Sequence, residues 1–291
     1  MLNECYELNN GVKIPKLGLG TWLIDNDKVV DVVKDALEVG YRHIDTAQAY
    51  ENEEGVGKAI RESGIPREEI FVTSKIAAEE KTYDDAYQSI VESLKKLGLD
   101  YLDLMIIHSP EPWAEFRGEK RYFEENKEVW RALETAYKEG KVKAIGVSNF
   151  LKDDLENILS SCEIKPMVNQ ILTHISNTKT ELIDFCKEQG ILVEAYSPIA
   201  HGAALKNETL INMAEKYHVS VAQLCIRYVL QLGLVALPKA STKEHIVDNS
   251  KMDFKISEDD MNTLKNMDTI ESYGSDDFFP VFSGKNQKNN Q

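Results

Sequence analysis

Residues 70–108 read IFVTSKIAAEEKTYDDAYQSIVESLKKLGLDYLDLMIIH, and this stretch decides the fold. It starts with the apolar run Ile70–Lys75, continues through an amphipathic pattern at Tyr83–Leu97, and ends on the apolar run Leu102–His108. Two apolar runs separated by a helical pattern predict parallel strands joined by a crossover helix. Each run ends on an ionisable side chain, Lys75 or His108, where a buried strand normally has none.

The same alternation continues along the whole chain. Further strands are expected at Lys16–Leu19, His43–Thr46, Val142–Val147, Met167–Ile171, Leu192–Tyr196 and Leu234–Lys239. Further helices are expected at Asp27–Val39, Asn52–Ser63, Lys127–Glu139, Lys152–Leu159, Lys179–Glu188, Leu210–Leu232, Lys243–Asn249 and Glu258–Met267. Because the units follow one another without a linker or a change in composition, they predict an α/β protein with one closed (β/α)8 TIM barrel over residues 1–291. The alternative, an open doubly wound sheet, would carry a GxGxxG fingerprint after its first strand, and GLGTWL does not match it.

Both ends of the chain lie outside this alternation. Residues 1–15 predict a β-hairpin around Asn9-Asn10-Gly11, because Asn-Gly is a strong hairpin turn signal. We expect this hairpin to cross the barrel bottom. Residues 268–291 form a C-terminal tail, expected near the active-site face, with a frayed polar end at 284–291.

Composition excludes several classes of function. The chain is 42% hydrophobic and 29% charged, which is typical of a globular protein, and its net charge of −15 does not attract nucleic acid or anionic membranes. The four cysteines form no CxxC pair, no signal peptide is evident, and the longest apolar run is Leu104–Ile107. We therefore expect a soluble cytoplasmic protein with reduced thiols, a monomer or alternatively a dimer, that acts on a small molecule.

Four polar side chains fall at or just beyond the ends of three successive strands: Asp45, Tyr50, Lys75 and His108. In a (β/α)8 barrel these ends form the catalytic face. A free phenol titrates near 10, and a neighbouring ammonium lowers that value, so Lys75 held by Asp45 would make Tyr50 a better acid. With His108 orienting an oxygen, the group suits proton donation to a carbonyl.

Each residue alone has a more ordinary interpretation. An isolated Asp–Lys pair is more often structural, and a single histidine at a strand end is as often a hydrogen-bonded filler as a ligand. The joint placement of all four favours the functional interpretation. We expect no metal site, because His108 has no second His or Cys at ligand spacing and His43 lies at the opposite strand end from Asp45.

These residues lie in motifs that resemble the aldo-keto reductase family, most like its prokaryotic-type members similar to diketogulonate and glyoxal reductases. The matching stretches are HIDTAQAYENEEGVGKAI, VTSK, DLMIIHSP, GKVKAIGVSNF, VNQI, EAYSP and LPKAST, and they span nearly the whole chain. The resemblance implies a barrel that binds an extended nicotinamide cofactor and reduces aldehydes or ketones to alcohols by hydride transfer. It implies that Tyr50 is the general acid, that Lys75 and Asp45 tune it, and that His108 orients the substrate.

The resemblance also implies a cofactor site. Its residues would be Thr21, Trp22, Asp45, Ser148, Asn149, Gln170, Tyr196, Ser197, Pro198, Lys239, Ser241, Thr242, His245, Asp248 and Asn249. Asn149 and Gln170 would pair with the carboxamide, and Tyr196 would stack on the nicotinamide. His245 stands where the family usually has an arginine that grips the 2′-phosphate of NADP, and imidazole is a poorer phosphate ligand. We therefore expect NADPH as cofactor, with NADH possible.

The implied substrate pocket consists of Trp22, Tyr50, Ala77, His108 and Ser109. Relatives often carry tryptophan at the positions of Ala77 and Ser109, so we expect a wider or wetter pocket. Two aromatic segments, Glu111–Phe123 and Tyr273–Phe282, are candidates either to cover the pocket or to pack on the barrel.

Two other functions are compatible with these residues. One is a non-catalytic family member that binds the cofactor and regulates a partner, although a regulator has no need of the complete set Asp45, Tyr50, Lys75 and His108. The other is a lyase or isomerase that forms a Schiff base on Lys75, which an ion pair with Asp45 disfavours because it keeps the amine protonated.

Overall fold

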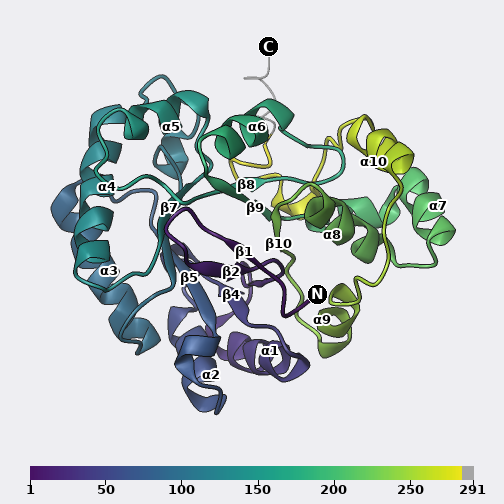
Figure 1. Cartoon of the computed structure of the whole chain (residues 1–291), viewed down its shortest axis with the longest axis horizontal. Helices are drawn as coiled ribbons and strands as arrows, with labels where there is room; N and C mark the ends of the chain where they lie inside the picture. The colour runs from purple at the N-terminus through teal and green to yellow at the C-terminus, as the bar shows by residue number, and fades with distance from the viewer. Residues whose placement is uncertain (284–291) are drawn as a thin grey trace.

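The computed structural model describes residues 1–283 and shows a parallel sheet surrounded by helices (Figure 1). Within these residues the sheet has eight strands that pair in chain order, from β3 to β10. They are β3 (Leu19–Gly20), β4 (His43–Asp45), β5 (Phe71–Ile76), β6 (Leu104–Ile107), β7 (Ile145–Ser148), β8 (Val168–Leu172), β9 (Leu192–Tyr196) and β10 (Val235–Leu237). Parallel bridges Leu17↔Ala236 and Gly20↔Lys239 join the first strand to the last. The sheet is therefore closed, which confirms the predicted barrel over an open sheet.

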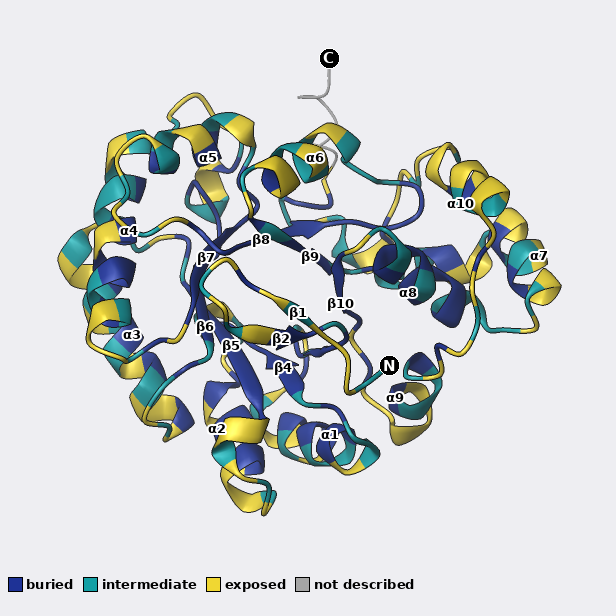
Figure 2. Ribbon diagram, viewed as in Figure 1, coloured by how far each residue is buried: buried dark blue, intermediate teal, exposed yellow. Residues whose placement is uncertain are grey.

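Ten α-helices lie outside the strands within the described residues. They are α1 (Asn26–Val39), α2 (Glu53–Glu62), α3 (Tyr83–Leu97), α4 (Phe123–Lys138), α5 (Lys152–Leu159), α6 (Thr180–Glu188), α7 (Glu208–Lys216), α8 (Val221–Gln231), α9 (Lys243–Asn249) and α10 (Glu258–Lys265). Figure 2 shows their buried faces turned toward the strands and their exposed faces turned outward. No helix among residues 1–283 is both long and apolar enough to span a bilayer.

Local sequence explains where the helices start and stop, as α3 illustrates. The Thr82 side chain accepts a hydrogen bond from the Asp85 N–H, which satisfies an otherwise unpaired donor at the start of the helix. Gly98 ends the helix in the left-handed conformation (φ 64°), which costs glycine no steric strain. Ala86 and Ile90 lie on the buried face between these limits.

One predicted helix is wrong. The expected helix Leu210–Leu232 is divided into α7 and α8. His218 has a φ of 56°, which no helix accommodates, and Ser220 starts α8 through a reciprocal pair of hydrogen bonds with Gln223. This Ser-x-x-Gln capping box is visible in the sequence.

The hairpin confirms its prediction. Strands β1 (Cys5–Glu7) and β2 (Lys13–Pro15) pair antiparallel and cross the barrel in Figure 1. The Asn9 side chain donates to the carbonyls of Pro166 and Gly190, which precede β8 and β9. The hairpin therefore closes the end of the barrel opposite the C-terminal strand ends. The polar end at 284–291, expected to be frayed, lies outside the described residues.

Candidate active site

The four polar residues predicted at the strand ends lie together. Asp45 is the last residue of β4, Lys75 lies in β5, and His108 directly follows β6. Tyr50 closes a 3₁₀ turn (Gln48–Tyr50) that begins shortly after β4. The Lys75 Nζ donates to Asp45 Oδ1 at 2.5 Å, to the Thr46 carbonyl at 2.9 Å and to the Tyr50 hydroxyl oxygen at 3.0 Å. The rings of Tyr50 and His108 meet edge to face, with centroids 5.7 Å apart.

Burial and neighbouring charges set the protonation states of this group. Burial disfavours the charge on Lys75, but attraction to Asp45 and Tyr50 outweighs it, and the lysine pKa is raised. Burial raises the pKa of Tyr50 more than the Lys75 cation lowers it, so the phenol is protonated at neutral pH. This differs from the expectation that Lys75 makes Tyr50 acidic outright. Burial and then Lys75 lower the pKa of His108 well below its usual value, so its ring is neutral.

A cavity of about 190 Å³ opens above these residues, and we call it the strand-end cavity. Its aromatic walls include Trp22, Trp113, Phe279 and Phe282. The Trp113 ring lies 5.2 Å from His108 and 4.7 Å from Phe279, measured between centroids. Both aromatic segments named from the sequence therefore cover the cavity, since Trp113 belongs to the loop after β6 and Phe279 to the C-terminal tail.

The expectation of a wide pocket differs from the structure, in which these aromatic side chains line the cavity. Neither Ala77 nor Ser109 is among the residues that line the strand-end cavity. The Ser109 side chain is fully buried, while its carbonyl accepts from Lys81. Trp113, four residues after Ser109, lines the cavity instead.

Two amide side chains from neighbouring strands face the strand-end cavity, Asn149 directly after β7 and Gln170 in the middle of β8. Gln170 Nε2 donates to Asp45 Oδ2 at 2.9 Å and to Glu194 Oε2 at 2.7 Å, which uses both of its hydrogens. Asn149 Nδ2 likewise donates to the His108 carbonyl and to Ser148 Oγ. The amide oxygens remain as acceptors, and the Asn149 oxygen also accepts from Tyr196 at 2.5 Å. A carboxamide, whose NH₂ group donates two hydrogens, fits this arrangement.

A second cavity of about 460 Å³, the adjoining cavity, shares Ser197, His201 and Lys239 with the first. It holds five further predicted cofactor residues: Pro198, Ser241, His245, Asp248 and Asn249. Thr21 lines the strand-end cavity, whereas Thr242 lines neither and caps α9 instead. The two cavities together form an extended site that suits a long dinucleotide.

Two polar residues of this region were missed from the sequence. His201 lies between the Ser197 hydroxyl (2.8 Å) and Asp276 of the tail (2.5 Å), and its distance from Asp276 in the chain hides this contact. Glu194 is fully buried within β9 beneath Gln170. The sequence does indicate Glu194, because a carboxylate inside the apolar run LVEAY is as unusual as the Lys75 ammonium inside its own strand.

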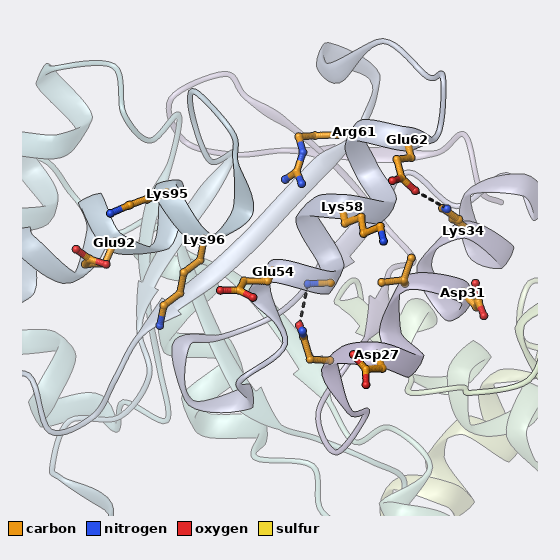
Figure 3. A pocket seen from close by; sticks show the side chains of 13 residues that line it. Asp27, Asp31, Lys34, Glu54, Lys58, Arg61, Glu62, Glu92, Lys95 and Lys96 are labelled. Carbon is orange, nitrogen blue, oxygen red and sulfur yellow. Dashed lines mark hydrogen bonds and ion pairs between the residues drawn. The ribbon is translucent and has the colours of Figure 1, made fainter.

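A larger cavity than these two lies elsewhere on the described part of the chain. An open groove of about 880 Å³ runs between α1, α2 and α3 (Figure 3). Charges of both signs line it, and Lys34 and Glu62 pair across it at 2.6 Å. It lies on the outer helices and includes none of the polar strand-end residues.

Known proteins are similar to this chain over nearly its whole length. The chain is 45% identical over 275 residues to a glyoxal reductase of Bacillus subtilis, covering 94% of this chain and 96% of that protein. It is 36% identical to a methylglyoxal reductase of Escherichia coli, covering 93% and 95%. The solved structure of a Bombyx mori aldo-keto reductase in complex with NADP matches with a TM-score of 0.83 and 34% identity, over 97% of this chain and 99% of that one.

The model of the Aldo/keto reductase family matches residues 16–269, which include every strand of the barrel and all four polar strand-end residues. Sequence identity, fold and site geometry therefore agree, and this chain belongs to the aldo-keto reductases.

Proposed function

We propose that this protein reduces small aldehydes and ketones to alcohols with NADPH, and that Tyr50 is the general acid. The observation that carries the proposal is the position of the Lys75 Nζ, which contacts both Asp45 Oδ1 (2.5 Å) and the Tyr50 hydroxyl (3.0 Å). Further support comes from relatives named glyoxal reductase and methylglyoxal reductase, and from solved relatives bound to NADP or NADPH.

Each residue of the site has a defined task in this reaction. NADPH, when bound, supplies the hydride that reaches the carbonyl carbon. The Tyr50 hydroxyl donates its proton to the carbonyl oxygen, and the Lys75 ammonium stabilises the phenolate left behind. Asp45 keeps Lys75 charged and in place. Neutral His108 orients the carbonyl oxygen by a hydrogen bond from its ring. The amide oxygens of Asn149 and Gln170 would accept hydrogen bonds from the carboxamide.

The cofactor preference depends on the adjoining cavity. Lys239 and Ser241 line it and offer a cation and a hydroxyl to the 2′-phosphate of NADPH. His245 lines it too but is exposed, so we propose weaker discrimination against NADH than an arginine would give.

The Schiff-base alternative is disfavoured by the hydrogen bonds of Lys75. Its Nζ donates to three acceptors, Asp45, the Thr46 carbonyl and Tyr50, and its pKa is raised. A lysine nucleophile needs the opposite, an amine that loses its proton readily.

The test compares Tyr50→Phe with the parent chain. NADPH oxidation is followed at 340 nm with glyoxal, methylglyoxal and a bulky ketone. We expect at least ~100-fold loss of kcat in Tyr50→Phe, the usual scale of general-acid catalysis. Tyr87→Phe is the matched control, because Tyr87 bonds Glu139 on the outside of the barrel. If the parent chain binds NADPH but does not oxidise it with any of the carbonyl compounds, the result would instead support a regulatory, non-catalytic protein.

A further inference from the structure

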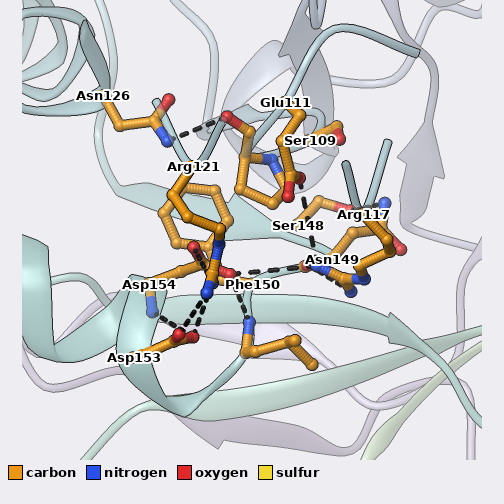
Figure 4. Close-up of polar contacts among 12 residues, drawn as sticks. Ser109, Glu111, Arg117, Arg121, Asn126, Ser148, Asn149, Phe150, Asp153 and Asp154 are labelled. Atoms are coloured by element: carbon orange, nitrogen blue, oxygen red, sulfur yellow. Dashed lines mark hydrogen bonds and ion pairs between the residues drawn. The ribbon is translucent and has the colours of Figure 1, made fainter. Parts of the chain in front are cut away.

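A cluster of buried charges lies beside the proposed nicotinamide site, on the loop that follows β6 (Figure 4). Its centre is Arg117, whose side chain is only 6% exposed. Two fully buried carboxylates face it: Glu111 on the same loop, with its Oε2 4.0 Å from Arg117 Nη1, and Asp154 of α5, with its Oδ2 3.8 Å away. Loops normally keep charged side chains in water, so this burial calls for a specific explanation.

Arg117 lies between the two carboxylates of this cluster, and Asp154 also pairs with Arg121. The pKa of Glu111 is raised to about 7, mainly by burial, with the Arg117 cation acting against this rise and the Asp154 carboxylate adding to it. Burying one guanidinium among carboxylates is costly unless its N–H groups are well placed. A tether for the loop alone would not need such burial, because a surface ion pair can serve that purpose.

The Arg117 guanidinium also contacts one residue of the strand-end cavity, Asn149. Arg117 Nη2 donates to the backbone carbonyl of Asn149 at 2.9 Å. Asn149 has a φ of 61°, in the left-handed region that few residues other than glycine adopt, and its N–H donates to the Gln170 carbonyl at 2.9 Å. Its backbone is thus held from both sides, by β8 and by Arg117.

The orientation of Asn149 determines several contacts of the site at once. Its Nδ2 donates to the His108 carbonyl at 3.0 Å, and its Oδ1 accepts from the Tyr196 hydroxyl at 2.5 Å. A rotation of this one peptide would move the acceptor proposed for the carboxamide and release Tyr196. Arg117 touches neither cavity, yet it holds the residue that connects two walls of the strand-end cavity.

We propose that Arg117 is a positioning residue for cofactor binding, which fixes Asn149 so that its side-chain oxygen faces the nicotinamide carboxamide. This inference rests on the proposed function, since it assigns a second layer of residues to the same cofactor site.

The same loop offers a matched control. Arg121 donates to both carboxylate oxygens of Asp153, at 2.5 and 2.8 Å, and to Asp154 Oδ1 at 3.0 Å. Both arginines therefore fasten the loop to α5, but of the two only Arg117 donates to Asn149 among the contacts of the described chain. Loss of a mere tether would affect both variants alike, whereas loss of positioning would affect only Arg117 variants.

The experiment uses the full chain with the variants Arg117→Met, Arg117→Lys, Arg121→Met and Glu111→Gln. Dissociation constants for NADPH come from quenching of protein fluorescence, kcat and KM from NADPH oxidation, and folding from the melting temperature. We expect Arg117→Met to weaken NADPH binding about 10-fold, the effect of losing one hydrogen bond to a charged group. Arg117→Lys should recover only part of this, because an ammonium lacks the fork that spans three partners.

The controls separate positioning from folding. Arg121→Met should lower the melting temperature while NADPH binding stays within about twofold of the parent, and Glu111→Gln should bind normally because its Arg117–Asn149 bond is intact. If Arg117→Met does not fold, the double variant Arg117→Met/Glu111→Gln is used in its place, because it also removes the Glu111 carboxylate that the first change leaves without its cation. Binding and kcat in that double variant equal to those of Arg121→Met would refute the role of Arg117 alone. A parent chain that does not bind NADPH would overturn the proposed function and, with it, this inference.

Discussion

Glu194 makes the stability of this protein depend on pH in a predictable way. The residue is fully buried in β9, and its Oε2 accepts from Gln170 directly beneath Asp45. Its pKa is raised from 4.5 to about 8, mainly by burial and then by the charge of Asp45, while the hydrogen bond from Gln170 and the charge of Lys75 act in the opposite direction. The folded protein therefore keeps the proton at neutral pH, whereas the unfolded chain releases it.

The sign and size of the effect follow from these two pKa values. Between them the unfolded state binds fewer protons than the folded state, so the free energy of unfolding falls as pH rises. The Glu194 contribution should fall by ~2 kcal/mol between pH 6 and pH 8. His43, 3.8 Å from Glu194 Oε1, is also buried, and burial lowers its pKa to about 4. The effect of His43 on the free energy of unfolding has the opposite sign and is complete above about pH 6.5. The parent chain and a variant changed at Glu194 share it.

Glu194→Gln is the perturbation that isolates this proton. Glutamine copies the shape of a protonated glutamate and keeps an oxygen for Gln170, but it does not ionise. Urea unfolding followed by circular dichroism at pH 6, 7 and 8 measures the difference between parent and variant. We expect the variant to gain ~2 kcal/mol on the parent over this range. Glu188→Gln, on an exposed position of α6, controls for the loss of one carboxylate. Equal pH slopes for the parent and Glu194→Gln would refute the reasoning.

Three further predictions concern the site. Lys75→Met should lower the free energy of unfolding by ~3–5 kcal/mol, because it leaves Asp45 buried without its cation; urea unfolding at pH 7 tests this, and an unchanged midpoint would contradict it. Phe279→Ala should raise KM for methylglyoxal by ~10-fold with little change in NADPH affinity, since it removes the ring that contacts Trp113. Equal effects on methylglyoxal and NADPH would contradict a role of this ring in substrate binding alone. His245→Arg should raise the NADPH-to-NADH ratio of kcat/KM by ~10-fold, and an unchanged ratio would exclude the adjoining cavity as the 2′-phosphate site.

The barrel and its polar strand ends could be predicted because they depend on local sequence. Alternating apolar and amphipathic segments determine strand and helix order, and parallel strands bring all their C-terminal ends to one face. Asp45, Lys75 and His108 therefore converge whatever the details of packing. The break between α7 and α8 was also local, and the Ser220–Gln223 capping box would have shown it.

The walls of the site could not be predicted in the same way, since they depend on contacts between distant segments. Trp113 lines the cavity only because the loop after β6 folds back over His108. Phe279 reaches it from 166 residues further along the chain (279 − 113), and no periodicity in the sequence encodes that contact. Asp276 finds His201 by the same route.

The meeting of Trp113 and Phe279 has a consequence for how this enzyme family can diversify. Neither residue belongs to a barrel strand or to one of its α-helices, and neither hydrogen-bonds Asp45, Tyr50 or Lys75 among the contacts of residues 1–283. Substitutions in these two segments can therefore change the walls of the strand-end cavity without removing a hydrogen bond among Asp45, Tyr50 and Lys75. The walls of the cavity and the polar group beneath them can therefore vary independently of each other.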